Sequence, residues 1–313
     1  ENDISEDAWR YVPRDAVYCV TIDDPIEAWK QIAGSNTWGH LQRNNWFADL
    51  TSAANSLDSL IRDNALLFDL IGSRSLIISA HMTGFKQSDF LFLVDLKNAS
   101  GITFLNDYLT SYRTGRVSVQ KERFLEEDLI TIRNAESNTN LYVSFPGKFL
   151  VASYNRKILM SSITAGKDTL YTAGNAIMNA VEEPGDNGLM KLYVNYEMLP
   201  AFVRTYSNEA ASGIERLALT LRSTSLRVTM EDDFIKAQGK TIVNDSVESY
   251  LKTLMVSGAG PSEFLEIAPQ RTAFAMALGF ESFQDFFINF EKNIQQDVTD
   301  YNSYRQSLLQ VEQ

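Results

Sequence analysis

The sequence predicts an α+β protein of repeated strand–helix units, with antiparallel sheets covered by helices. Residues 12–29 have the pattern of an apolar strand, an acidic turn and an amphipathic helix. The same order returns at residues 268–287, near the C-terminal end. Between them, short β-type runs are joined by connections too short for the crossovers that parallel strands need. We therefore expect antiparallel order, with helices on one face of each sheet.

The opening unit carries the signals of a strand followed by a helix. Val17–Ile22 is rich in β-branched and aromatic residues, which favour strands. Asp24 is placed to cap a helix, Pro25 stands at its first position, and Glu27 is the acidic residue three positions after the cap. The sequence therefore predicts that a helix begins at Pro25.

The C-terminal copy has a predicted strand at Thr272–Phe280 and then a strongly apolar helix. Its apolar stripe consists of Phe283, Phe286, Phe287, Phe290 and Ile294. We expect this helix to be buried against a sheet, because such a stripe is too apolar to face water. The weaker stripe of residues 298–313 has two interpretations, the fraying end of a core helix or a contact with another subunit, a partner or a continuation of the chain.

The middle of the chain is predicted to alternate between helices and strand pairs. Residues 73–81 and 89–96 are a predicted hairpin, and residues 50–61 and 102–112 are predicted helices. Further strands are predicted at 117–124, 129–133, 141–145, 149–154, 191–196, 225–231 and 234–243, and further helices at 156–180, 199–206, 214–221 and 247–256.

The domain prediction rests on one boundary. The stretch EEPGDNG at residues 182–188 is acidic and holds a proline and two glycines, as linkers do. We expect a first α+β lobe over 1–184, a second over 185–265, and the start of a further strand–helix unit, packed on the second lobe, over 266–313.

Composition and charge exclude several functions. The chain has 313 residues and a formal net charge of −12, which argues against nucleic acid and anionic membrane surfaces as partners. No run approaches the roughly 18–20 apolar residues that span a bilayer. Membrane association is therefore expected only through a segment absent from this chain. The polar start at Glu1 fits an exported protein after removal of a leader, although a trimmed cytosolic chain would look the same.

The cysteine and histidine residues of the chain, which could act as nucleophiles or metal ligands, predict no catalytic, cofactor-binding or metal site. Cys19 lies inside the first strand and is expected to be a small buried hydrophobe. His40 and His81 lie in separate elements without the spacing of a metal motif, so we predict His40 at the surface and His81 as an ordinary edge or core residue. A Ser/His/Asp site would need one of these two histidines, and neither has supporting context in the sequence.

Carboxylate clusters could perform glycosidic chemistry or bind calcium. They occur at 23–24, 126–128, 182–183 and 231–233. Asp24 is explained as a helix cap, and the other clusters fall in turns where charge is solvated. None has the spacing of a calcium loop, and the Gly-rich stretch at 257–262 lacks the lysine of a phosphate-binding loop.

Residues 12–45 resemble a known family. The match consists of Pro13, Asp15 and Ala16 before the strand, Pro25 and Trp29 in the helix, and the segment from Trp38 to Leu41. The resemblance is to an uncharacterised family of exported bacterial proteins, a domain of unknown function common in Bacteroidetes and cyanobacteria. It implies a periplasmic or otherwise extracytoplasmic location, a membrane anchor in the full-length protein, and a chain free to continue past residue 313. It brings no catalytic residues.

These observations together predict a non-catalytic cell-envelope protein that acts as a binding or scaffolding module. The expected partner is an envelope protein, or a second copy through the C-terminal helix, and no cofactor is expected. The alternative is a carboxylate-based hydrolase that acts on an envelope polymer. A deep pocket with two inward carboxylates would favour this alternative, whereas a shallow groove or an exposed apolar patch would favour binding.

Overall fold

The computed structural model describes residues 5–43, 74–97, 99–111, 117–136, 138–168, 177, 188–206, 211–231, 234–247, 249–258, 260–261, 277–294 and 298–311. Within these residues it has ten helices and one ten-stranded antiparallel sheet, so the protein is mixed α+β as predicted. The chain divides into two compact units. The first comprises Glu1–Ala218 with Ser223–Ile242, and the second Leu219–Arg222 with Val243–Gln313.

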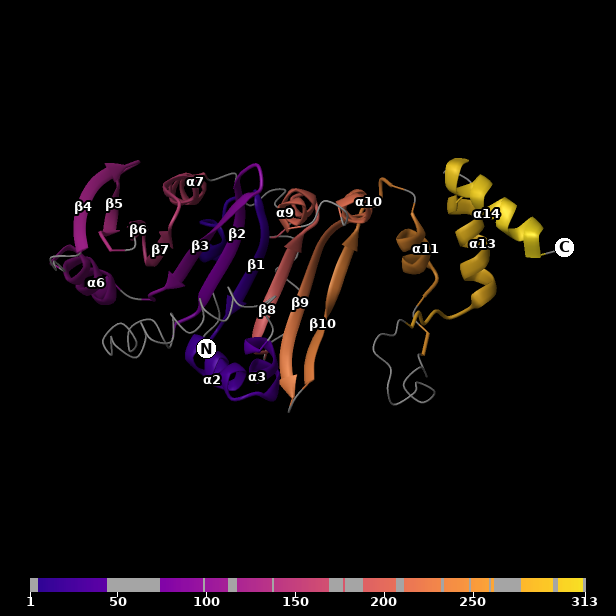
Figure 1. The fold of residues 1–313 in the computed structure, drawn as a ribbon, viewed down its shortest axis with the longest axis horizontal. Coiled ribbons are helices and arrows are strands. Elements are labelled where there is room, and N and C mark those ends of the chain that lie inside the picture. Colours follow the sequence, from indigo (N-terminus) through magenta and orange to yellow (C-terminus); the bar gives the residue numbers. More distant parts are fainter. Residues whose placement is uncertain are drawn as a thin grey trace. The chain divides into compact units, whose positions relative to one another are not determined.

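The sheet places the opening strand near its middle. Its order is β10-β9-β8-β1-β2-β3-β7-β6-β5-β4 (Figure 1). The strands are β1 Ala16–Ile22, β2 Leu76–Gly84, β3 Gln87–Asp95, β4 Val117–Phe124, β5 Glu127–Asn134, β6 Thr139–Ser144, β7 Phe149–Ser153, β8 Met190–Asn195, β9 Leu221–Glu231 and β10 Phe234–Val243. Strand β1 pairs antiparallel with β2 on one side and with β8 on the other.

Short turns explain the antiparallel order. Strands β2 and β3 are joined through Phe85 and Lys86, and Lys86 takes a φ of 56°. Strands β4 and β5 are joined in the same way through Leu125 and Glu126, with φ values of 48° and 70°. Such two-residue connections join only antiparallel neighbours. The predicted hairpin and the predicted meander of β4 to β7 are confirmed.

Helix α2 of the first unit begins at the residue that the sequence predicted. The helices of this unit are α1 Glu6–Trp9, α2 Pro25–Ala33, α3 Asn36–Gln42, α6 Ala99–Ser111, α7 Arg156–Lys167, α9 Leu199–Tyr206 and α10 Ala211–Thr220. At α2, the Asp24 carboxylate accepts a hydrogen bond from the Glu27 amide at 2.9 Å, and Pro25 is the first helical residue. The predicted cap is confirmed. The predicted helix at 50–61 lies outside the described residues.

Helices pack on both faces of the sheet, whereas we expected them on one. Helix α7 adds Leu159 and Ile163 to a buried cluster that includes Val151 of β7. Helix α6 adds Leu105 to a second cluster, packed against Leu150 of β7. Because successive strand residues point to opposite faces, the two helices cover opposite faces of β7. The expectation of cover on one face was wrong because antiparallel order does not fix the side on which each connection passes.

Beyond the last residue of β10, Val243, the second unit contains helices and no strand among the residues that the structure describes. They are α11 Tyr250–Val256, α13 Phe283–Ile294 and α14 Val298–Val311. The rings of Phe286 and Phe290 make edge contacts with Tyr250. Phe286 is buried, but Phe283 is 68% exposed and Phe287 36% exposed. The prediction that this stripe is buried against a sheet was therefore wrong, because α13 packs by one edge on α11.

The structure does not confirm the predicted C-terminal repeat, and it divides the chain at a different place from the predicted lobes. Residues 272–276 lie outside the described residues, and Ala277–Phe280 form neither strand nor helix, so the C-terminal strand was not found where the structure describes it. The predicted boundary at 184 is followed by β8, which pairs with β1 in the same sheet. The division between the compact units falls instead after Ile242.

Candidate functional site

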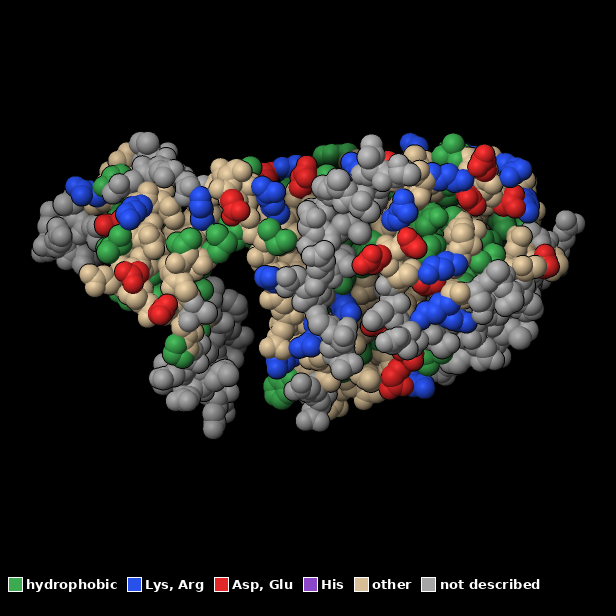
Figure 2. All heavy atoms as spheres, turned by 180° about the vertical axis from the view of Figure 1, so that it is seen from behind, with side chains coloured by type: hydrophobic (Ala, Val, Ile, Leu, Met, Phe, Trp, Pro, Cys, Tyr) green, Lys and Arg blue, Asp and Glu red, His purple; other side chains and the backbone are tan. Residues whose placement is uncertain are grey.

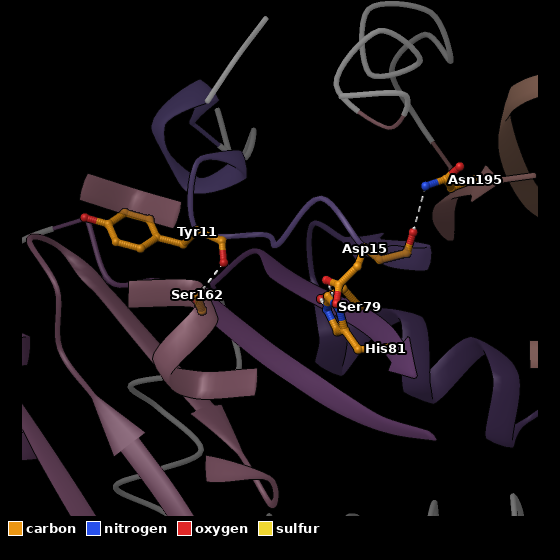
Figure 3. A network of polar contacts seen from close by, with 7 residues as sticks. Tyr11, Asp15, Ser79, His81, Ser162 and Asn195 are labelled. Atoms are coloured by element: carbon orange, nitrogen blue, oxygen red, sulfur yellow. Dashed lines mark hydrogen bonds and ion pairs between the residues drawn. The ribbon is translucent and has the colours of Figure 1, made fainter. Parts of the chain in front are cut away.

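The chain between α1 and β1 is held by side chains from three distant elements (Figure 3). The Ser162 hydroxyl of α7 donates to the Tyr11 carbonyl oxygen at 2.5 Å. The Asn195 amide of β8 donates to the Ala16 carbonyl oxygen at 3.2 Å. Both side chains are buried, so each bond satisfies a polar group that water does not reach. The segment before β1 is thereby fastened to the sheet and to α7.

The third contact is a buried histidine between a serine and a carboxylate. The Nδ1 atom of His81 lies 3.1 Å from Oδ1 of Asp15, and its Nε2 atom lies 2.8 Å from Oγ of Ser79 (Figure 3). A carboxylate only accepts hydrogen bonds, so Nδ1 of His81 carries the proton and donates to Asp15. In the neutral ring, Nε2 then accepts from the Ser79 hydroxyl. We call these three residues the Asp15–His81–Ser79 cluster.

Local structure explains why these residues meet. Ser79 and His81 are two positions apart in β2, so both side chains point to the same face of the sheet. The Ala16 amide donates to the Pro13 carbonyl at 3.1 Å, and this turn leads directly into β1 with Asp15 inside it. Because Ala16 is paired with His81 in the β1–β2 ladder, Asp15 lies beside the ring.

Two titratable groups here are shifted by their surroundings. The pKa of Asp15 lies below its ordinary value, first because His81 donates a hydrogen bond to the carboxylate and second because of the charge interaction between them, while partial desolvation opposes both. The pKa of Tyr11 is raised, chiefly by burial and then by the negative charge of Glu127. Asp15 is therefore ionised over the whole neutral range.

The cluster has the hydrogen-bonded arrangement of a catalytic triad, aspartate to histidine to serine, but its serine is buried and its aspartate is exposed. In a serine hydrolase the serine reaches the substrate and the aspartate is buried behind the histidine. Here the Ser79 residue is 0% exposed and His81 is 1% exposed, whereas the Asp15 side chain is 61% exposed. A nucleophile sealed in the core cannot meet a substrate. The arrangement fits a structural hydrogen-bond relay.

Two cavities lie between the Pro13–Asp15 segment and α7. The smaller, about 100 Å³, is lined by Asp15 and His81 among others, but not by Ser79. The larger is an open groove of about 660 Å³, with Phe124 and Met160 among its apolar lining residues. Its charged lining residues are Arg14, Lys157 and Asp168. Neither cavity has two carboxylates, so neither has the acid–base pair that glycoside hydrolysis uses.

The other candidates of the sequence take structural places. Cys19 is fully buried, and burial raises the pKa of its thiol, which confirms the prediction of a small buried hydrophobe. His40 is exposed as predicted, with its Nδ1 atom 3.3 Å from Nη2 of Arg43. The described residues hold no group of three or more His, Cys, Asp or Glu side chains placed to bind a metal ion.

The carboxylates at the β4–β5 turn are matched by lysines. Nζ of Lys167 lies 3.1 Å from Glu127 and 3.7 Å from Glu126, and Nζ of Lys121 lies 2.8 Å from Asp128. These are surface ion pairs and not an open cation site. Residues 182–183 and 232–233 of the other acidic clusters lie outside the described residues.

The comparisons with known proteins add no relative. No protein-family model, no curated protein and no solved structure matches this chain. In the described part of the chain, no helix combines the length and the apolar character needed to cross a membrane.

Sequence reasoning missed the Asp15–His81–Ser79 cluster. One signal was available, because Ser79 and His81 are separated by one residue in a predicted strand and must share a face. The partner was not predictable in the same way, since Asp15 is 66 positions from His81 and only the β1–β2 register brings them together.

Proposed function

We propose that this protein is a non-catalytic module of the bacterial cell envelope that binds or scaffolds a partner. The observation that carries the binding role is the edge strand β10. Eight of its ten residues, Phe234–Thr241, are exposed, and Phe234 and Ile235 are 77% and 55% exposed. A long exposed edge with large apolar side chains is a surface on which another chain can pair.

The non-catalytic part of the proposal is supported by the Asp15–His81–Ser79 cluster. Its serine is sealed and its carboxylate faces outward, so the cluster fits a stabilising role. The carboxylate-based hydrolase requires two inward carboxylates in one pocket, and the two cavities beside the cluster have one each. No observation on the described residues favours that alternative.

The envelope location is supported by the resemblance of residues 12–45 to exported bacterial proteins. The structure of that region is a strand, a capped helix and a second short helix, in which the Trp29 and Trp38 rings meet edge to face at 5.1 Å. The tryptophans that contribute to the resemblance are thus packing residues. Location itself rests on the resemblance alone.

Fractionation of native cells, followed by purification of the full-length protein from the membrane fraction, tests the proposal. We expect recovery in the envelope together with a partner in constant ratio. Recovery in the soluble cytosol would contradict the location. Release of soluble fragments from an envelope polymer by the purified protein would contradict the non-catalytic role.

A further inference from the structure

The two cavities beside the Pro13–Asp15 segment share part of their lining. Pro13, Lys157 and Ser161 line both the small cavity of about 100 Å³ and the open groove of about 660 Å³. Lys157 and Ser161 are four positions apart in α7, so they lie on one face of that helix. The small cavity therefore adjoins the groove along this face, and one ligand can occupy both.

The small cavity has one charge of each sign in its lining, a carboxylate from Asp15 and an ammonium group from Lys157. Figure 2 shows Lys and Arg side chains beside Asp and Glu side chains on one face of the molecule, and Lys121 pairs with Asp128 at 2.8 Å. Lys157 differs, because its backbone amide donates to Asn155 but no ion pair within the described residues engages its ammonium group. A ligand that carries both charges close together would complement this lining.

The carboxylate of Asp15 is held in place by the protein itself. His81 donates to it from Nδ1 at 3.1 Å, and the hydrogen bond from the Ala16 amide to the Pro13 carbonyl fixes the turn that contains it. A carboxylate has about four lone-pair sites, so Asp15 can accept from a ligand as well as from His81. An acceptor that is already positioned loses little conformational freedom when a ligand binds.

The groove supplies an apolar surface next to these charges. Phe124 and Met160 line it, and both pack against the main buried cluster, so the core fixes their positions. The volume of about 660 Å³ lies within the range of small-molecule sites. The small cavity, about 100 Å³, has room for about three waters at about 30 Å³ each. It therefore takes a charged head group, and the groove takes an apolar side chain.

We propose that the two cavities bind a free α-amino acid with a large apolar side chain. The α-ammonium group donates to Asp15, the α-carboxylate accepts from Lys157, and the side chain lies on Phe124 and Met160. The charged hydrogen bonds select the head group, and burial of apolar surface selects the side chain. This inference goes beyond the proposed partner-binding function, since it involves neither β10 nor a second protein.

Titration of the whole chain with free L-phenylalanine in an isothermal calorimeter tests this directly. Three analogues each lack one part of the ligand. N-acetyl-L-phenylalanine lacks the ammonium group, L-phenylalanine amide lacks the carboxylate, and glycine lacks the side chain. We expect saturable binding of L-phenylalanine and binding weaker by about tenfold or more for each analogue.

Two variants remove the charges one at a time. Asp15→Asn and Lys157→Met should each weaken binding of L-phenylalanine by about tenfold. Asp245→Asn and Lys292→Met make the same changes at exposed residues of the second unit and should leave binding unchanged. If each charge meets its own ligand group, Lys157→Met should not weaken binding of the amide further, and Asp15→Asn should not weaken binding of the acetylated analogue further.

A blocking variant tests the site without altering Asp15, which also stabilises the fold. Ser161→Trp places a large side chain at an exposed position that lines both cavities, and it should abolish binding. Ser118→Trp is the matched control, because Ser118 is exposed on β4 and lies six residues, about 20 Å, from Phe124 along the strand. The melting temperature of each variant establishes that it is folded.

Any of four results would overturn the inference. They are no binding of L-phenylalanine at about 10 mM, undiminished binding of the acetylated or the amide analogue, unchanged binding by folded Ser161→Trp, and tighter binding of the tripeptide Phe-Gly-Gly than of the free amino acid. The last result would assign the site to the amino terminus of a peptide. None of these results changes the fractionation or the turnover assay, so the two proposals fail separately.

Discussion

Removal of the Asp15 carboxylate tests whether the buried histidine relay stabilises the fold. In Asp15→Ala, the Nδ1–H group of His81, a residue 1% exposed, loses its acceptor. An unsatisfied buried donor costs about 1–3 kcal/mol. We expect the lower end, about 1 kcal/mol, because the Asp15 side chain is 61% exposed and the adjoining cavity of about 100 Å³ can admit water.

Urea unfolding at neutral pH measures this loss. Asp15→Asn keeps an acceptor oxygen and should lose about half as much as Asp15→Ala. Asp245→Asn removes an exposed carboxylate elsewhere and should change the unfolding free energy by less than about 0.5 kcal/mol. If Asp15→Ala is as stable as the wild type, the relay does not stabilise the fold and the reasoning fails.

The pH dependence follows from the sign of the Asp15 shift. The folded-state pKa of Asp15 lies below its ordinary value of 3.8. A lowered carboxyl pKa contributes stability that is complete above the unfolded value and is lost as the pH falls through the folded value. The stability advantage of the wild type over Asp15→Asn should therefore be constant above about pH 5 and shrink below pH 3.8. An advantage that grows on acidification would contradict the shift.

Three further predictions concern packing and capping. A Cβ on Gly239 would lie 1.8 Å from the Ser225 carbonyl oxygen, so Gly239→Ala should lower the unfolding free energy by about 1–3 kcal/mol, whereas Gly213→Ala, with no neighbour within 4 Å, should not destabilise. Cys19 should resist a thiol reagent in the native protein and react fully in denaturant, and fast native labelling would contradict its burial. Asp24→Ala should cost about 1 kcal/mol in chemical denaturation through loss of the α2 cap, and an unchanged midpoint would contradict that role.

The sequence predicted the elements that depend on local chemistry. The start of α2 followed from Asp24 and Pro25, and the β2–β3 hairpin followed from two apolar runs with a short connection. These signals are contained in a few adjacent residues, so tertiary context did not override them.

The parts that depend on distant contacts were not predictable. The apolar stripe of α13 predicted a buried helix, yet Phe283 at its start is 68% exposed. A hydrophobic pattern shows which face of a helix is apolar, but it does not show what covers that face. The domain boundary failed for a similar reason, since pairing of β8 with β1 continues the sheet past the acidic linker. The Asp15–His81–Ser79 cluster likewise required the register of β1 and β2.

The claim that the Asp15–His81–Ser79 cluster stabilises the fold without catalysis is tested most directly by a fluorophosphonate reagent. The native protein is incubated with the reagent beside a known serine hydrolase, and the intact mass of each is measured. Because Ser79 is fully buried, we predict an unchanged mass for this protein while the hydrolase is labelled. A mass increase that peptide mapping locates on Ser79 would contradict a purely structural role.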